Sequence, residues 1–164
     1  MADFVKEHLA DELKKLPSFK AGDYDLAMKD IYIRIDEMLV TKEGKAKLKS
    51  YKTSGDTTSS LFGKGDSEIA HAAGCTACSV IITPTDIICG NSGDSRAVLA
   101  RKSGDKYIAI NLSEDHKPDL PGEKLRIEKA GGFVEENRGK GVLAVSRALG
   151  DLEYKLDPNL PVEK

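Results

Sequence analysis

The fold is decided by residues 76–112, TACSVIITPTDIICGNSGDSRAVLARKSGDKYIAINL. The segment contains four short runs that are rich in Val and Ile, at 76–82, 86–89, 96–101 and 106–112. These runs have the length and composition of β-strands. The connections between them carry Gly, Pro, Ser and Asp and are too short for a helical crossover. We therefore predict an antiparallel meander.

Helical periodicity precedes this stretch. From Ala2 to Leu16 apolar residues recur every three or four positions, and Pro17 ends the pattern. Neither Met1 nor Ala2 can cap the helix with its side chain, so we expect the chain to begin inside a longer domain. A second helix is predicted after the N-cap residue Asp23. Its predicted buried stripe consists of Leu26, Ala27, Ile31, Ile35, Met38 and Leu39.

A third helix is predicted from Pro121 to Lys129, because Pro favours the first helical turn and the following Gly131-Gly132 stops a helix. This helix should bury Leu125 and Ile127. Short strands should follow at 133–135 and 142–145.

These elements predict an α+β domain of antiparallel sheets with flanking helices. Residues 1–48 should form a helical part, and residues 73–164 a β-rich part with one helix. Residues 49–72 lie between them and are rich in Ser, Thr, Gly and Lys, which predicts a mobile loop.

The composition narrows the classes of partner. The 164 residues carry a net charge of −2, with both signs spread along the chain, so nucleic acid and anionic membranes are not expected partners. No apolar run approaches the length of a membrane span, and no secretory signal opens the chain. We expect a soluble intracellular protein, cytoplasmic or nuclear.

The chain has three cysteines, Cys75, Cys78 and Cys89, which lie in or beside β-like runs. An odd number cannot pair fully within one chain, so we interpret them as reduced core thiols. Cys75 and Cys78 also match C-x-x-C, the spacing of a redox site or of half a zinc site, but no second pair completes it.

Asp94 is the carboxylate best placed for chemistry, because it lies in a turn after Gly93 between two predicted strands. Such a position suits a ligand for a hard cation, although a single carboxylate is too few for one. The same position also suits an Asp that only caps local N–H groups of the turn.

The other polar residues that could take part in catalysis could equally have a purely structural role. His116, in Glu114–Pro118, could act as an acid or base, or could simply be fixed in its loop. Ser95 and Ser146 lack the glycines of a nucleophile elbow. Arg147 could bind phosphate, but we favour an i,i+4 ion pair with Asp151 on a helical turn. No catalytic or phosphate-binding residue is assigned.

Five motifs follow one another along the chain: GCTA at 74–77, NSGDSR at 91–96, DHKP at 115–118, RIEKAGG at 126–132 and LAVSRALGDLEYK at 143–155. Together they resemble the middle portion of the metal-dependent type 2C protein serine/threonine phosphatases. The resemblance implies an α-β-β-α sandwich, here incomplete, with two Mn²⁺ or Mg²⁺ ions and phosphoprotein substrates. It implies that Asp94 is a metal-associated carboxylate and that Thr76, Gly93 and Asp151 support the site.

The chain departs from that family in lacking its principal metal-ligand motifs, such as Asp-Gly-His-Gly-Gly. We therefore expect the isolated chain to be inactive and to bind no metal of its own. The alternative is a non-catalytic, phosphatase-like binding or regulatory module. An incomplete sandwich should also expose apolar sheet surface and so predicts self-association.

Overall fold

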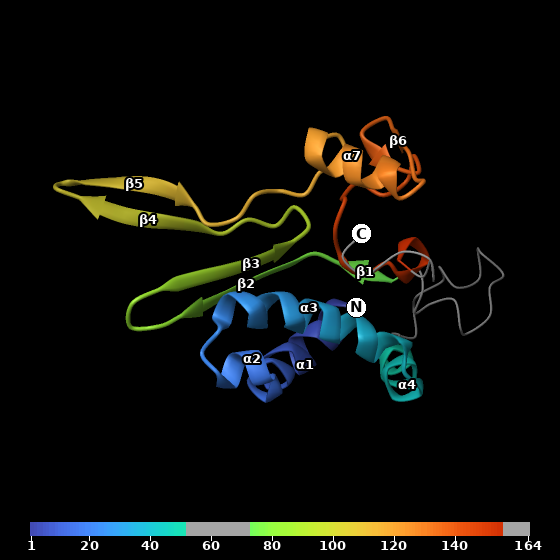
Figure 1. The fold of residues 1–164 in the computed structure, drawn as a ribbon, viewed down its shortest axis with the longest axis horizontal. Coiled ribbons are helices and arrows are strands. Elements are labelled where there is room, and N and C mark those ends of the chain that lie inside the picture. The colour runs from blue at the N-terminus through green and yellow to red at the C-terminus, as the bar shows by residue number, and fades with distance from the viewer. Residues whose placement is uncertain (52–72, 156–164) are drawn as a thin grey trace. The chain divides into compact units, whose positions relative to one another are not determined.

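The computed structural model describes residues 1–51 and 73–155 (Figure 1). The chain divides into two compact units. Of the described residues, 1–51, 73–75 and 149–155 form the helical unit, and 76–148 form the β unit.

The helical unit contains α1 (Ala2–Lys15), α2 (Pro17–Lys20), α3 (Tyr24–Val40) and α4 (Lys42–Ser50). As predicted, the first long helix ends before Pro17, and Met1 forms no side-chain hydrogen bond that would cap it. The unit's core lies between α1 and α3. Its fully buried side chains include Phe4, Ile31, Ile35, Leu39, Leu149 and Leu152.

Asp23 caps α3 as predicted, since its Oδ1 accepts a hydrogen bond from the N–H of Leu26 at 3.1 Å. The buried stripe is confirmed for four of its members, Ala27, Ile31, Ile35 and Leu39, and Met38 is half-buried. Leu26 is the exception: it is 46% exposed, because it lies about 100° around the helix axis from Ala27, which is fully buried.

Helix α4 continues to Ser50, so the first two residues of the loop predicted at 49–72 are helical. The rest of that loop, from residue 52 onward, lies outside the described residues. Thr41 caps α4 by accepting the Gly44 N–H at 3.0 Å.

A two-stranded pair brings distant parts of the chain together in the helical unit. Strand β1 (Gly74–Cys75) pairs antiparallel with β8 (Leu149–Gly150), and the 3₁₀ helix η1 (Leu152–Tyr154) follows. Asp36 of α3 fixes this segment, because its carboxylate accepts the Gly150 N–H at 2.7 Å and the Lys155 ammonium at 2.6 Å.

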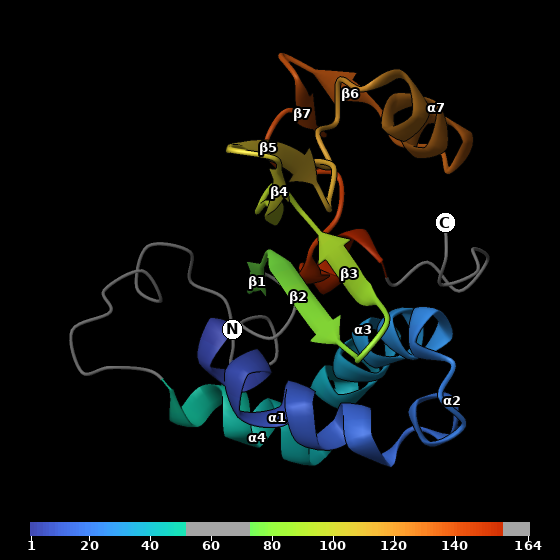
Figure 2. The same ribbon diagram turned by 90° about the vertical axis from the view of Figure 1, so that its left-hand side faces the viewer.

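Two hairpins contain the longest strands of the β unit (Figure 2). Strand β2 (Ala77–Ile82) pairs with β3 (Ile87–Ser92), and β4 (Val98–Ser103) pairs with β5 (Lys106–Asn111). The antiparallel pairing within each hairpin is as predicted, but the continuous meander is wrong because β3 and β4 do not pair. Instead, the Ala97 N–H donates to Ser113 Oγ and the Ala97 carbonyl accepts the Leu112 N–H, both at 2.9 Å.

Helix α7 (Pro121–Lys129) has the bounds predicted for the third helix. Its predicted packing is wrong in part: Leu125 is 52% exposed and Ile127 is half-buried. Little covers the outer face of this short helix, because within the β unit its main packing partner is β6.

Strand β6 (Val134–Glu135) is as predicted, but it pairs with an unpredicted β7 (Arg138–Gly139). Residues 142–145 form no strand. They contribute one bridge, Gly139 to Leu143, because left-handed conformations at Lys140 and Gly141 fold the chain back too tightly for a ladder. Helices together with small antiparallel sheets confirm the α+β class.

Candidate functional site

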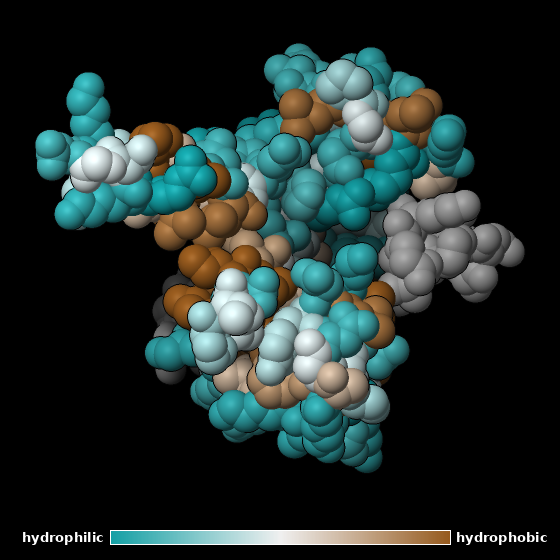
Figure 3. Space-filling model, turned by 60° about the vertical axis from the view of Figure 1, so that its left-hand side comes forward, coloured by the Kyte–Doolittle hydropathy of each residue, from teal (hydrophilic) through white to brown (hydrophobic). Residues whose placement is uncertain are grey.

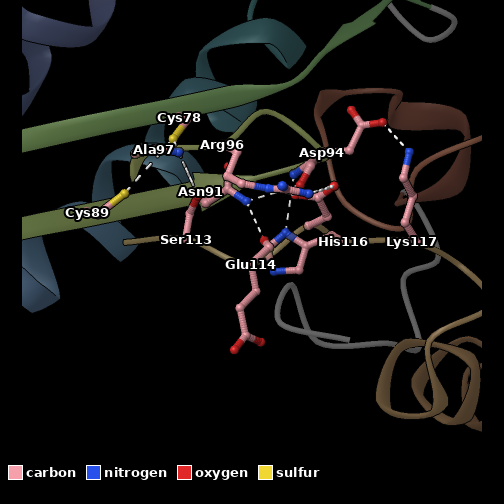
Figure 4. A network of polar contacts seen from close by, with 12 residues as sticks. Cys78, Cys89, Asn91, Asp94, Arg96, Ala97, Ser113, Glu114, His116 and Lys117 are labelled. Carbon is pink, nitrogen blue, oxygen red and sulfur yellow. Dashed lines mark hydrogen bonds and ion pairs between the residues drawn. The ribbon is translucent and has the colours of Figure 1, made fainter. Parts of the chain in front are cut away.

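The turn that carries Asp94 is held by residues that follow β5 (Figure 4). His116 binds Gly93 twice: its backbone N–H donates to the Gly93 carbonyl at 2.9 Å, and its Nδ1 accepts the Gly93 N–H at 3.2 Å. The Asn91 side-chain amide donates to the carbonyls of Gly93 at 3.1 Å and Glu114 at 2.7 Å. These bonds fix the backbone on both sides of the turn, and we call this arrangement the Asp94 clamp.

Gly93 and Thr76, both predicted to support the site, lie together at this turn. Gly93 has φ +113°, and a Cβ there would lie 2.4 Å from Thr76 Cγ2, so only glycine fits without strain. Thr76 Oγ1 also lies 2.8 Å from Ser95 Oγ, so a hydrogen bond between the two hydroxyls holds Ser95 in the turn. Their role in chemistry stays a prediction.

Arg96 and Asp115 form a two-pronged ion pair at the exposed edge of the clamp. Arg96 Nε donates to Asp115 Oδ1 and Arg96 Nη2 to Asp115 Oδ2, both at 3.0 Å. The hydrogen bonds from Arg96 lower the pKa of Asp115, and the same bonds raise the pKa of Arg96. Sequence reasoning missed this pair, although both residues belong to the recognised motifs.

The carboxylate of Asp94 accepts a hydrogen bond from the ammonium of Lys117. Both side chains are partly exposed, 34% for Asp94 and 40% for Lys117. Asp94 is thus placed at a strand end as expected, but its partner is a cation of the chain itself. The sequence alone does not reveal this pairing, because it depends on how the segment that contains Lys117 lies against the turn.

A complete metal centre does not fit the described residues. Among them, no group of three or more His, Cys, Asp or Glu side chains could hold a metal ion. Hard cations such as Mg²⁺ take several oxygen ligands, and Asp94 offers one carboxylate, which Lys117 already neutralises.

Asp151 lies in the helical unit, between β8 and η1, in a left-handed conformation with φ 48°. Its carboxylate packs against Gly74 of β1, where a Cβ would lie 2.2 Å from Asp151 Cγ. Burial raises the pKa of Asp151.

Arg147 does not pair with Asp151, and that prediction is wrong. Arg147 instead binds Glu123 of α7 through two hydrogen bonds, Nε to Oε2 at 2.9 Å and Nη2 to Oε1 at 2.7 Å. The i,i+4 pairing fails because residues 147–151 form no helical turn; they lead into strand β8.

Glu123 connects this ion pair to the clamp. Burial alone would raise the pKa of Glu123, but hydrogen bonds from Arg147 and Arg126 outweigh it and lower the pKa to about 2. Arg126 Nη2 also donates to the Ser146 carbonyl at 2.7 Å, and the Ser146 N–H donates to the His116 carbonyl at 3.0 Å. Burial, and then the nearby Arg147 charge, lower the pKa of His116, which favours the neutral ring that accepts from Gly93.

The site lies in an α+β domain, and comparisons with known proteins identify its family. The family model described as protein phosphatase 2C matches residues 1–163. The chain therefore belongs to the protein phosphatase 2C family.

Relatives support the same assignment. Protein phosphatase 2C 1 of Paramecium tetraurelia is 44% identical over 160 residues, which are 98% of this chain and 48% of that protein. Protein phosphatase 2C homolog 2 of Schizosaccharomyces pombe is 39% identical over 165 residues, covering 100% of this chain and 37% of the relative. The chain thus spans about half the length, or less, of these curated relatives.

The fold likeness extends to solved structures. The serine-threonine phosphatase 2C of Toxoplasma gondii superposes with a TM-score of 0.62 at 22% identity, covering 93% of this chain and 55% of that one.

Within the described ranges, no helix is both long and apolar enough to cross a membrane.

Proposed function

We propose that this chain forms part of a metal-dependent protein serine/threonine phosphatase that hydrolyses phosphoserine and phosphothreonine in protein substrates. Membership of the protein phosphatase 2C family supports this function. The observation that carries it is the Asp94 clamp, in which the Asn91 amide donates to the Gly93 carbonyl and the His116 ring accepts the Gly93 N–H, so that the backbone beside Asp94 is fixed at a strand end.

We further propose Asp94 as a ligand of Mn²⁺ or Mg²⁺, with Thr76, Gly93 and Asp151 in support. Because the described residues supply too few oxygen ligands for such an ion, the 164-residue chain by itself should be inactive.

Three free cysteines suit a reducing compartment, and we propose a cytoplasmic or nuclear location. The division into a helical part, a loop and a β-rich part (73–164) is also proposed, with the helical part extended from 48 to Ser50 and the loop shortened accordingly.

The test is hydrolysis of p-nitrophenyl phosphate and of a phosphopeptide by the isolated chain with Mn²⁺, beside Asp94→Ala. We expect no turnover above the rate without protein. Metal-dependent turnover that Asp94→Ala abolishes would overturn the proposed inactivity while supporting the phosphatase chemistry.

The ion pair between Asp94 and Lys117 favours a second candidate function, a non-catalytic phosphatase-like module. In such a module the carboxylate would need no metal, because Lys117 neutralises it. Phosphopeptide binding that is unchanged by a metal chelator, measured by calorimetry without turnover, would support the module over the phosphatase.

Self-association is proposed through one face of the β2–β3 hairpin, where apolar side chains are exposed (Figure 3). Val80, Ile82 and Ile87 lie on that face and are 41%, 76% and 42% exposed. Light scattering at high concentration should detect dimers or larger species, and Ile82→Lys should reduce them. A wild-type chain that stays monomeric would contradict this part.

A further inference from the structure

Two thiols face each other across the β2–β3 hairpin. The Sγ atoms of Cys78 and Cys89 lie 4.0 Å apart (Figure 4). Cys78 is opposite Asn91 and Cys89 is opposite Val80, so the two thiols are diagonal neighbours on one face of the hairpin. Both cysteines are free and half-buried. The paired thiols are thus Cys78 and Cys89 on two strands, and not the Cys75-x-x-Cys78 of the sequence motif.

We propose that Cys78 and Cys89 bind a thiophilic divalent metal ion of the Zn²⁺ and Cd²⁺ class through both sulfurs. Zn–S bonds of about 2.3 Å at a tetrahedral angle place two sulfurs about 3.8 Å apart. The observed separation of 4.0 Å therefore needs only a small inward shift. Thiolates select soft metals, whereas Mg²⁺ and Mn²⁺ prefer oxygen ligands, so this site is chemically distinct from the proposed Asp94 centre.

Binding exchanges protons for the metal. Each thiol releases one proton to solvent as its sulfur bonds the ion, and two thiolates with one divalent cation sum to zero charge. A neutral assembly suits a half-buried position beside Val80. Without a metal, burial and the neighbouring Cys78 raise the pKa of Cys89 to about 11, so its thiol keeps its proton at neutral pH.

The register disfavours a disulfide between the same residues. Diagonal neighbours on paired strands have Cα atoms about 7–8 Å apart, whereas bridged cysteines usually have about 4.4–6.8 Å. A metal ion spans the longer gap because each sulfur bonds the ion rather than the other sulfur. Within the described ranges no third His, Cys, Asp or Glu completes a ligand group, so water fills the remaining positions.

The test uses the reduced 164-residue chain, titrated with CdCl₂ without oxygen, and follows the ultraviolet thiolate-to-cadmium absorption. We expect a band that saturates at one equivalent in the wild type and in Cys75→Ser, whose thiol lies in β1 of the helical unit and serves as the matched control. Cys78→Ser and Cys89→Ser should each lose the band. A band kept in either of these variants, or lost in Cys75→Ser, would overturn the proposal.

A second measurement needs no variant. Alkylation of the wild type with iodoacetamide, read by mass spectrometry, should show Cd²⁺ protecting Cys78 and Cys89 but leaving Cys75 as reactive as before. Equal protection of all three thiols, or none, would contradict a two-thiol site. A product lighter by two hydrogens, which is the disulfide, would equally reject it. Neither readout depends on phosphatase activity.

Discussion

Replacing Glu123 with Gln should destabilise the β unit, because Glu123 holds two arginines. The side chain is 12% exposed and accepts hydrogen bonds from Arg147 and Arg126. A pKa lowered from 4.5 to about 2 corresponds to roughly 3 kcal/mol of stabilisation at neutral pH. Arg147 is 41% exposed, and solvent screening reduces the expected loss to about 2 kcal/mol.

The pH dependence has a definite sign. The pKa is lower in the folded chain than in the unfolded one, so the stabilisation is present above pH 4.5 and is lost as the pH falls toward about 2. The difference in unfolding free energy between the wild type and Glu123→Gln should therefore be largest near neutral pH and should shrink steadily below about pH 4.5.

Urea denaturation at a series of pH values measures this difference, and hydrogen exchange of the α7 amides reports it locally. Glu128→Gln is the matched control on the same helix, because Glu128 is 48% exposed and lies 3.9 Å from Lys124. The control should change stability by less than about 0.5 kcal/mol. Equal effects of the two variants at pH 7, or a Glu123→Gln effect that persists unchanged at pH 2, would refute the reasoning.

Two further changes test the clamp. Gly93→Ala should cost about 2–3 kcal/mol in urea unfolding, since φ is +113° and the new Cβ would meet Thr76 Cγ2 at 2.4 Å. Gly104→Ala is its control: with φ +62° and nothing within 4 Å, it should cost only about 1 kcal/mol, and equal losses would contradict the steric explanation. Arg96→Ala should destabilise the chain only slightly, because its pair with Asp115 is exposed, and the loss should shrink as salt is added. A loss independent of salt would show that Arg96 acts through packing.

Local sequence signals predicted the helices α1, α3 and α7, but not α2 or α4. Asp23 and Pro121 mark helix starts through the chemistry of a single turn, which the sequence contains in full. Periodicity, in contrast, identifies an apolar face without saying what covers it. Leu26 and Leu125 fit their stripes and are nevertheless exposed, because burial depends on neighbours distant in the sequence.

The contacts of the candidate site were harder to predict, because they join residues that are far apart in the sequence. The turn around Asp94 could be recognised from its glycine and its flanking strands. Its contact with Lys117, 23 residues away, depends on how the segment after β5 returns to the turn. Arg147 shows the same limit: an i,i+4 partner was the nearest candidate in the sequence, but the chain is not helical there and Arg147 pairs with Glu123.

The carboxylates of Asp94, Asp115 and Glu123 each have a cationic partner within the chain. Lys117 neutralises Asp94, Arg96 neutralises Asp115, and Glu123 lies between two arginines. A hard cation at Asp94 would meet the positive charge of Lys117, whose ammonium binds Oδ2, and one carboxylate alone supplies too few oxygen ligands. Mn²⁺ or Mg²⁺ binding at Asp94 thus requires oxygen ligands beyond those that the described residues bring to this turn.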